Sequence, residues 1–167
     1  MDQISITPVH HDDIDELIAI ARHIWHAHYP GIISLEQIEY MLAAGYDRQV
    51  IRDEMEQQGI TWLRIRDGSA MIGFASVGPY GVGVMKLHKL YLLPQYHGKG
   101  VGASALKEVE GIARGAGAAR LVLNVNKHNA KAIRSYQRSG WSVAEAVCVD
   151  IGAGFVMDDY VMAKELV

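Results

Sequence analysis

The feature that most restricts the fold is a glycine-rich turn between an apolar strand and a helix. The segment reads Leu90-Tyr91-Leu92-Leu93-Pro94-Gln95-Tyr96-His97-Gly98-Lys99-Gly100-Val101-Gly102. Its three glycines remove the side chains that would keep an anion away from the backbone amides at the helix N-terminus. The turn therefore predicts a site for a pyrophosphate, and a plain strand-to-helix turn is the competing interpretation.

Two other phosphate-binding folds fit this turn less well. Gly98, Gly100 and Ala103 satisfy the pattern G-x-G-x-x-G/A, but a dinucleotide fold also places an acidic residue at the end of the next strand. Here that strand is Leu121–Asn126, and it contains no acid. The chain has no G-x-x-x-x-G-K-[S/T] segment, which excludes a P-loop. A nicotinamide or flavin oxidoreductase is therefore disfavoured.

The spacing of apolar residues predicts a mixed α/β unit. Helices are expected over 14–28, 34–42, 47–57, 103–114 and 129–138. Strands are expected over 4–8, 60–65, 71–77, 84–93, 120–125, 141–149 and 155–164. No repeat or linker-like run interrupts this order, so one domain over residues 1–167 is predicted.

Two motifs carry a resemblance to a known family. Gln95 to Gly100 matches the pattern Q/R-x-x-G-x-G/A, and in this the chain resembles the GNAT acetyltransferases. Asn129 to Trp141 is similar to the family segment N-x-x-A-x-x-x-Y-x-x-x-G-F/W, and one helix and one strand separate the two motifs. The resemblance implies the GNAT fold, an α/β fold whose mostly antiparallel sheet of about seven strands is splayed at the cofactor strand and flanked by helices.

The resemblance also implies acetyl-CoA as the acetyl donor, bound beside the splayed strand. The backbone of Leu90, Tyr91 and Leu92 would pair with the pantetheine arm. Asn129, a natural helix N-cap, and Tyr136 would contact the cofactor as well. The pyrophosphate would be held by the amides of the turn, namely those of His97, Gly98, Lys99, Gly100, Val101 and Gly102.

Acetyl transfer to nitrogen requires a neutral amine, and deprotonating a lysine-like amine at pH 7 costs about 4.6 kcal/mol. His88 is a candidate base, because it lies two residues before Leu90 and is expected on the same strand face. A water chain to a distant carboxylate is the alternative. Tyr136 matches the family position of the general acid that protonates the leaving thiolate, and an ordinary packing tyrosine is its competing role.

The acceptor pocket of this family lies near the first helices and the last strands. The residues Trp25, His28, Tyr29 and Asp158 fall there and are the candidates, since aromatic rings and carboxylates suit a cationic amine. Packing of the aromatic residues is the competing interpretation. The three histidines at 23, 26 and 28 lack a cysteine or carboxylate that would complete a ligand set, so no metal is predicted.

The composition restricts the partners and the location that we expect for the protein. The formal charge of −3 argues against nucleic acid, and no apolar run is long enough to span a membrane. Cys148 is the only cysteine and the N-terminus does not resemble a signal peptide, so a cytoplasmic protein is expected. The family resemblance makes a homodimer plausible.

Together these features predict an N-acetyltransferase that moves an acetyl group to a primary amine of a small molecule, polyamine or peptide. Residues 25–29 and 34–42 are weakly similar to polyamine acetyltransferases, which makes spermidine one candidate. The alternative is a noncatalytic acyl-CoA sensor or scaffold. Tyr136 favours the enzyme, because binding alone needs no proton donor.

Overall fold

The computed structural model describes residues 3–166, so both ends of the predicted domain, residues 1–2 and 167, lie outside the described residues. The N-terminal half contains β1 (Ile4–Pro8), η1 (His11–Asp13), α1 (Ile14–His28), α2 (Leu35–Gly45), α3 (Arg48–Gln57), β2 (Thr61–Asp67) and β3 (Ala70–Gly81). The rest contains β4 (Val84–Leu92), η2 (Pro94–Tyr96), α4 (Val101–Gly115), β5 (Arg120–Asn126), α5 (Ala130–Arg138), β6 (Ser142–Gly152) and β7 (Phe155–Glu165). The expected order of helices and strands is confirmed, and β3 and β6 run a few residues further than predicted.

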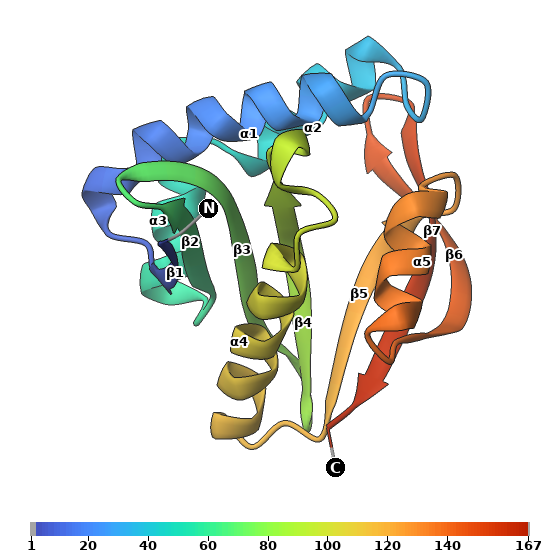
Figure 1. The fold of residues 1–167 in the computed structure, drawn as a ribbon. Helices are drawn as coiled ribbons and strands as arrows, with labels where there is room; N and C mark the ends of the chain where they lie inside the picture. Colours follow the sequence, from blue (N-terminus) through green and yellow to red (C-terminus); the bar gives the residue numbers. More distant parts are fainter. Residues whose placement is uncertain (1–2, 167) are drawn as a thin grey trace.

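The strands form one sheet in the order β1-β2-β3-β4-β5-β7-β6. Every neighbouring pair is antiparallel except β4 and β5, which are parallel. These two strands pair only from Val84 to Lys86 on β4, opposite Arg120 to Val122 on β5. Beyond that point they diverge, as Figure 1 shows. The predicted seven-stranded, mostly antiparallel sheet, splayed at the strand before the glycine turn, is confirmed.

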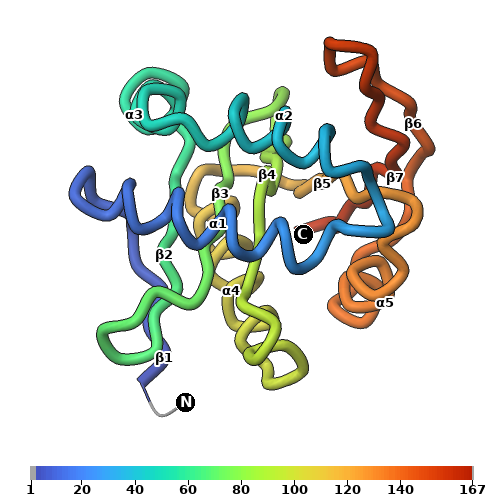
Figure 2. The backbone as a smooth tube through the Cα atoms, turned by 90° about the horizontal axis from the view of Figure 1, so that it is seen from above, coloured from blue at the N-terminus to red at the C-terminus, as the bar shows by residue number. Residues whose placement is uncertain are grey.

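Helices cover both faces of the sheet, with α2 and α3 on one side and α4 and α5 on the other (Figure 2). Trp62 and Phe74 are fully buried beneath α1, α2 and α3. Leu121 and Met162 are fully buried on the opposite face, under α4 and α5. Burying each such side chain stabilises the fold by about 1.5–3 kcal/mol, and the two layers together hold β4 in place.

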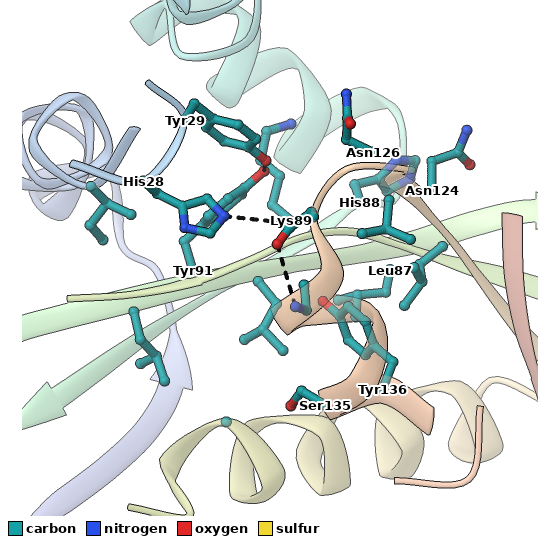
Figure 3. A pocket seen from close by; sticks show the side chains of 18 of the residues that line it. His28, Tyr29, Leu87, His88, Lys89, Tyr91, Asn124, Asn126, Ser135 and Tyr136 are labelled. Carbon is teal, nitrogen blue, oxygen red and sulfur yellow. Dashed lines mark hydrogen bonds between the residues drawn. The ribbon is translucent and has the colours of Figure 1, made fainter. Parts of the chain in front are cut away.

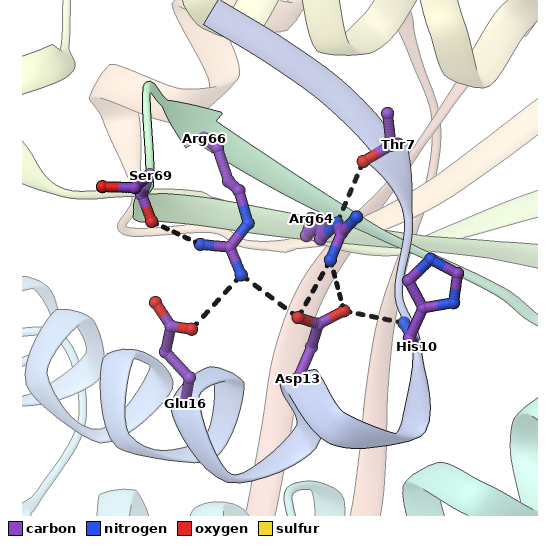
Figure 4. A network of polar contacts seen from close by, with 7 residues as sticks. All are labelled: Thr7, His10, Asp13, Glu16, Arg64, Arg66 and Ser69. Atoms are coloured by element: carbon purple, nitrogen blue, oxygen red, sulfur yellow. Dashed lines mark hydrogen bonds and ion pairs between the residues drawn. The ribbon is translucent and has the colours of Figure 1, made fainter.

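A buried ion-pair network fixes the start of α1 to β2 (Figure 4). The Asp13 carboxylate lies 2.8 Å from Arg64 Nη1 and 3.1 Å from Arg66 Nη2, and it accepts the His10 amide at 2.8 Å. The Asp13 side chain makes no capping bond to α1 itself. Burial alone would raise the pKa of Asp13, and the amide with the two guanidiniums holds this pKa below its ordinary value.

Side-chain caps begin the next two helices. Ser34 Oγ accepts the amide of Gln37 at 3.1 Å, and Asp47 Oδ1 accepts the amide of Gln49 at 2.9 Å. Each bond satisfies a backbone donor that the first turn of a helix leaves without a partner. No helix within residues 3–166 has the length and apolar character needed to cross a bilayer.

A β-bulge in β4 changes which face its residues occupy. Ser76 of β3 pairs with Lys89 and Val77 pairs with Leu87, so His88 is an extra residue with no partner in the register. The prediction that His88 shares a face with Leu90 depended on unbroken alternation along the strand, and the bulge breaks that alternation.

Candidate active site

A cavity of about 770 Å³ lies where β4 and β5 separate. Residues from α1, β4, the glycine turn, β5, α5 and the β6–β7 hairpin line it. The structure brings most of the predicted site residues to this cavity: Trp25, His28, Tyr29, His88, Leu90, Tyr91, Leu92, His97, Gly98, Gly100, Gly102, Asn129 and Tyr136.

Three predicted residues do not line the cavity. Lys99 is exposed, and the side chain of Val101 is buried in the core beside Leu92, so only the backbone of Val101 is available to a ligand. Asp158 forms an ion pair with Lys127, with 2.6 Å between Oδ1 and Nζ, outside the cavity lining. The neighbouring Asp159 lines the cavity instead.

The glycine turn forms an open cradle at the start of α4. Gly98 and Gly100 have φ of 73° and 82°, in the left-handed region, and an added Cβ at either position would meet no heavy atom within 4 Å. The first-turn amides of α4 have no acceptor within the helix. Free amides beside empty space are what a pyrophosphate requires, so this cradle fits that group.

His97 fixes the turn to the two walls of the cavity. Its Nε2 lies 3.1 Å from the carbonyl oxygen of Leu92, and its Nδ1 lies 3.2 Å from Lys131 Nζ on α5. Because an ammonium group can only donate, Nδ1 accepts from Lys131 and Nε2 donates to Leu92.

The edge of β4 that faces the cavity is open. The pairs with β5 end at Lys86, so between Leu87 and Leu92 β3 is the only strand partner of β4 within the described residues. Backbone donors and acceptors on the other edge therefore face the cavity, where an extended ligand with amide groups can pair with them.

Asn129 connects α5 to α1. Its Oδ1 accepts the amide of Ala132 at 3.3 Å as the N-cap of α5, and its Nδ2 lies 3.1 Å from Nε2 of His28. Burial lowers the pKa of His28, and the positive charge of Lys131 lowers it further. His28 is therefore neutral near pH 7, and its Nε2 accepts the bond from Asn129.

Tyr136 lies on the last turn of α5, across the cavity from β4. Its ring packs against Trp141, and Figure 3 shows the hydroxyl directed toward the cavity, with His28, Tyr29 and Tyr91 grouped on another wall. Burial raises the pKa of Tyr136, so the phenol is protonated at neutral pH and can donate a hydrogen bond.

His88 has a buried Nε2 that no described residue contacts by hydrogen bond. Burial, followed by the charges of Lys86 and Lys89, lowers the pKa of His88 to about 4. The imidazole is neutral and free to accept, but moving a proton to it from a lysine-like ammonium costs about 9 kcal/mol. His88 alone is thus a weak base.

Asp159 is a buried cavity carboxylate that the sequence did not distinguish from Asp158. Its side chain is 1% exposed and its Oδ1 has no hydrogen-bond partner among the described residues. Burial raises the pKa of Asp159 against the opposing effects of the Asn124 hydrogen bond and the Lys86 charge. The two aspartates are distinguished only by the pairing register of β7, which places Asp159 opposite Asn126 on β5.

Aromatic side chains line the cavity wall to which α1 contributes. Trp25 and Tyr29 have ring centroids 4.5 Å apart, and the Tyr29 and Tyr91 hydroxyls lie 2.8 Å from each other. Trp25 Nε1 donates to the Tyr46 hydroxyl at 3.2 Å. Burial raises the pKa of Tyr29 to about 12. These residues pack the helix onto the sheet and shape the cavity at the same time.

Two of the three histidines of α1 contact other side chains of the protein. His26 Nε2 lies 2.8 Å from a carboxylate oxygen of Glu39, while His28 binds Asn129. In the part of the chain that the structure describes, no three His, Cys, Asp or Glu side chains gather closely enough to hold a metal ion.

Known proteins match the chain over most of its length. The Acetyltransferase (GNAT) family matches residues 17–141. An uncharacterized N-acetyltransferase of Mycobacterium tuberculosis is 31% identical over 93% of this chain and 99% of its own length. A spermidine N(1)-acetyltransferase of Thermoplasma acidophilum is 28% identical over 93% of this chain and 96% of its own length. The crystal structure of the PaiA N-acetyltransferase of T. acidophilum in complex with coenzyme A has a TM-score of 0.82 and 27% identity, and covers 98% of this chain and 99% of its own.

Proposed function

The chain belongs to the GNAT acetyltransferase family, and on that premise we propose that it transfers the acetyl group of acetyl-CoA to a primary amine of a small molecule, polyamine or peptide. The observation that carries this proposal is the position of Tyr136, whose hydroxyl faces the cavity opposite the open edge of β4. A proton donor and an amide-binding edge on facing walls suit acyl transfer from a thioester.

The residues that would hold acetyl-CoA follow from the cradle and the open strand edge. The first-turn amides of α4 and the empty space at Gly98 and Gly100 would bind the pyrophosphate. The free backbone edge between Leu87 and Leu92 would bind the amides of the pantetheine arm. When bound, acetyl-CoA supplies an electrophilic thioester carbonyl that the amine attacks.

The protein then has two proton transfers to support. As the C–N bond forms and the C–S bond breaks, one proton leaves the amine nitrogen and one must reach the thiolate sulfur. We assign donation to sulfur to the Tyr136 hydroxyl. The amine proton passes to His88 or Asp159, which hold the unpartnered buried acceptor atoms of the cavity.

The test is release of free thiol from acetyl-CoA, followed with a chromogenic thiol reagent across polyamines, amino acids, aminoglycosides and peptides. Release with one class of amine would support the proposal and name the acceptor class. Acetyl-CoA binding with no release from any amine would instead support the noncatalytic sensor.

We also propose a cytoplasmic location and a homodimer, as expected from the sequence and the family resemblance. Cell fractionation tests the first. Light scattering of the purified chain over a range of concentrations tests the second, and a monomeric mass throughout would contradict it.

A further inference from the structure

We propose that the acceptor is a primary amine that carries a carboxylate on the same molecule, such as an amino acid or a short peptide. Asp159 would bind the ammonium group and Lys86 the carboxylate. This inference rests on the proposed acetyl transfer and narrows its substrate class.

The charges of the cavity lining are mostly basic. Within the described residues, the lining includes the lysines 86, 89 and 131, and Asp159 is its one carboxylate. A polyamine brings several positive charges, and each would need a carboxylate partner or would face a lysine. Like charges brought together in a partly buried site cost several kcal/mol, so this lining opposes a polycation.

Asp159 has the properties of a site for a single ammonium group. It is almost completely buried, it faces the cavity, and its Oδ1 lacks a hydrogen-bond partner in the described structure. A buried polar atom without a hydrogen-bond partner destabilises the fold. An ammonium group bound there would supply the missing donor.

Lys131 already donates to His97, so Lys86 is the lysine of the lining that we assign to a second substrate group. It lies where β4 and β5 begin to diverge, and it is half-buried. Its Nζ lies 5.0 Å from the ring centroid of Tyr80, and within residues 3–166 it forms no ion pair. Burial lowers the pKa of Lys86, and the charge of Asp159 opposes that effect.

Lys89 differs from Lys86 because two aromatic rings, and not one, lie beside its ammonium group. Its Nζ lies 5.3 Å from the ring centroid of Tyr46 and 5.2 Å from that of Trp62. Burial lowers the pKa of Lys89, and the charge of Glu54 opposes that effect. We therefore assign the substrate carboxylate to Lys86 and the substrate amine to Asp159, whose buried Oδ1 lacks a partner among the described residues.

The decisive experiment compares amino acids with their decarboxylated counterparts on the wild-type protein. Lysine and cadaverine, ornithine and putrescine, and tyrosine and tyramine form matched pairs, with spermidine as a further acceptor. A partly buried charge-assisted hydrogen bond predicts kcat/KM at least about tenfold higher for the acid of a pair. Equal or higher kcat/KM for the amines or for spermidine would overturn the inference.

Substitutions then assign the effect to Lys86. Lys86→Met should raise KM for the acid about tenfold and bring the two members of a pair close together, while acetyl-CoA affinity is unchanged. Lys86→Arg should retain most of the preference. The matched control is Lys107→Met, at an exposed position of α4 outside the cavity lining, which should behave like wild type.

The two proposals fail in different ways. If no acceptor of either kind releases thiol although acetyl-CoA binds, the acetyl transfer itself is wrong. If thiol is released and an acid preference survives in Lys86→Met, transfer stands and the role of Lys86 is wrong.

Discussion

The ring of Tyr136 packs on the ring of Trp141 across the end of α5, with centroids 5.8 Å apart. Backbone hydrogen bonds at the end of α5 explain this distance between the rings. The Trp141 amide donates to the Tyr136 carbonyl at 3.1 Å, the Gly140 amide donates to the Gln137 carbonyl at 3.1 Å, and Gly140 has φ of 91°. These bonds form a Schellman motif, in which the residue after the glycine contacts the residue five positions earlier. The motif Y-x-x-x-G-W therefore holds the tyrosine ring in place.

This packing makes Tyr136→Phe a test of the hydroxyl alone. Phenylalanine retains the contact with Trp141, so we expect the fold and acetyl-CoA affinity to be unchanged. We expect kcat to fall by about 10² or more, because the thiolate loses its proton donor. Thiol release with acetyl-CoA and amine both saturating measures kcat, and calorimetry measures affinity. Tyr160→Phe, outside the cavity lining, is the control, and equal kcat in both variants would remove Tyr136 from the chemistry.

The cradle can be tested with two glycines that share a backbone conformation. Gly100 and Gly117 have φ of 82° and 81°, and an added Cβ at either would meet nothing within 4 Å. Alanine at each should cost about 1 kcal/mol of strain. Only Gly100→Ala should also weaken acetyl-CoA binding, by about tenfold, because its methyl group fills the space for the pyrophosphate. Comparable affinity in the two variants would show that the cradle does not bind the cofactor.

How far sequence predicts this site depends on whether the geometry is local. The glycine turn, the Asn129 cap and the place of Tyr136 were predictable, since each depends on a few successive residues. The bulge at His88 was not, because it arises from the register between β3 and β4. The roles of Asp158 and Asp159 could not be separated either, since only the pairing of β7 with β5 shows which one faces the cavity.

The Asp13 network predicts a pH-dependent contribution to stability. Because the pKa of Asp13 is lowered in the fold, its stabilisation is present above the unfolded value of about 3.9 and is lost as pH falls through the folded value. Asp13→Asn should reduce the free energy of unfolding by about 3 kcal/mol at pH 7, since Arg64 and Arg66 lose their charged partner. The difference from wild type should shrink below about pH 4. Urea unfolding at several pH values measures this difference.

Asp12→Asn provides the control for that series, because Asp12 is exposed beside the same helix start. The free energy of unfolding of this variant should equal that of wild type at every pH. A difference between Asp13→Asn and wild type that stays constant down to pH 3 would mean that packing, and not the charge, carries the effect.

The tip of the β6–β7 hairpin should control access of the acceptor. Tyr40 on α2 donates to the Ile151 carbonyl at 2.7 Å, and Ile151 lines the cavity. A Cβ at Gly152 would lie 2.5 Å from the Tyr40 hydroxyl, whereas a Cβ at Gly154 would meet nothing within 4 Å. Both glycines have positive φ, 97° and 81°, so alanine at either adds similar backbone strain.

Gly152→Ala should therefore separate the hairpin tip from α2, whereas Gly154→Ala should not. We expect KM for the amine to rise severalfold in Gly152→Ala, with acetyl-CoA affinity unchanged, because the cradle lies at α4 and not at the tip. Initial rates of thiol release at varied amine and fixed acetyl-CoA give this KM. If the two variants have the same KM, the contact between Tyr40 and Ile151 does not shape the acceptor site, and the cavity wall is set by β7 alone.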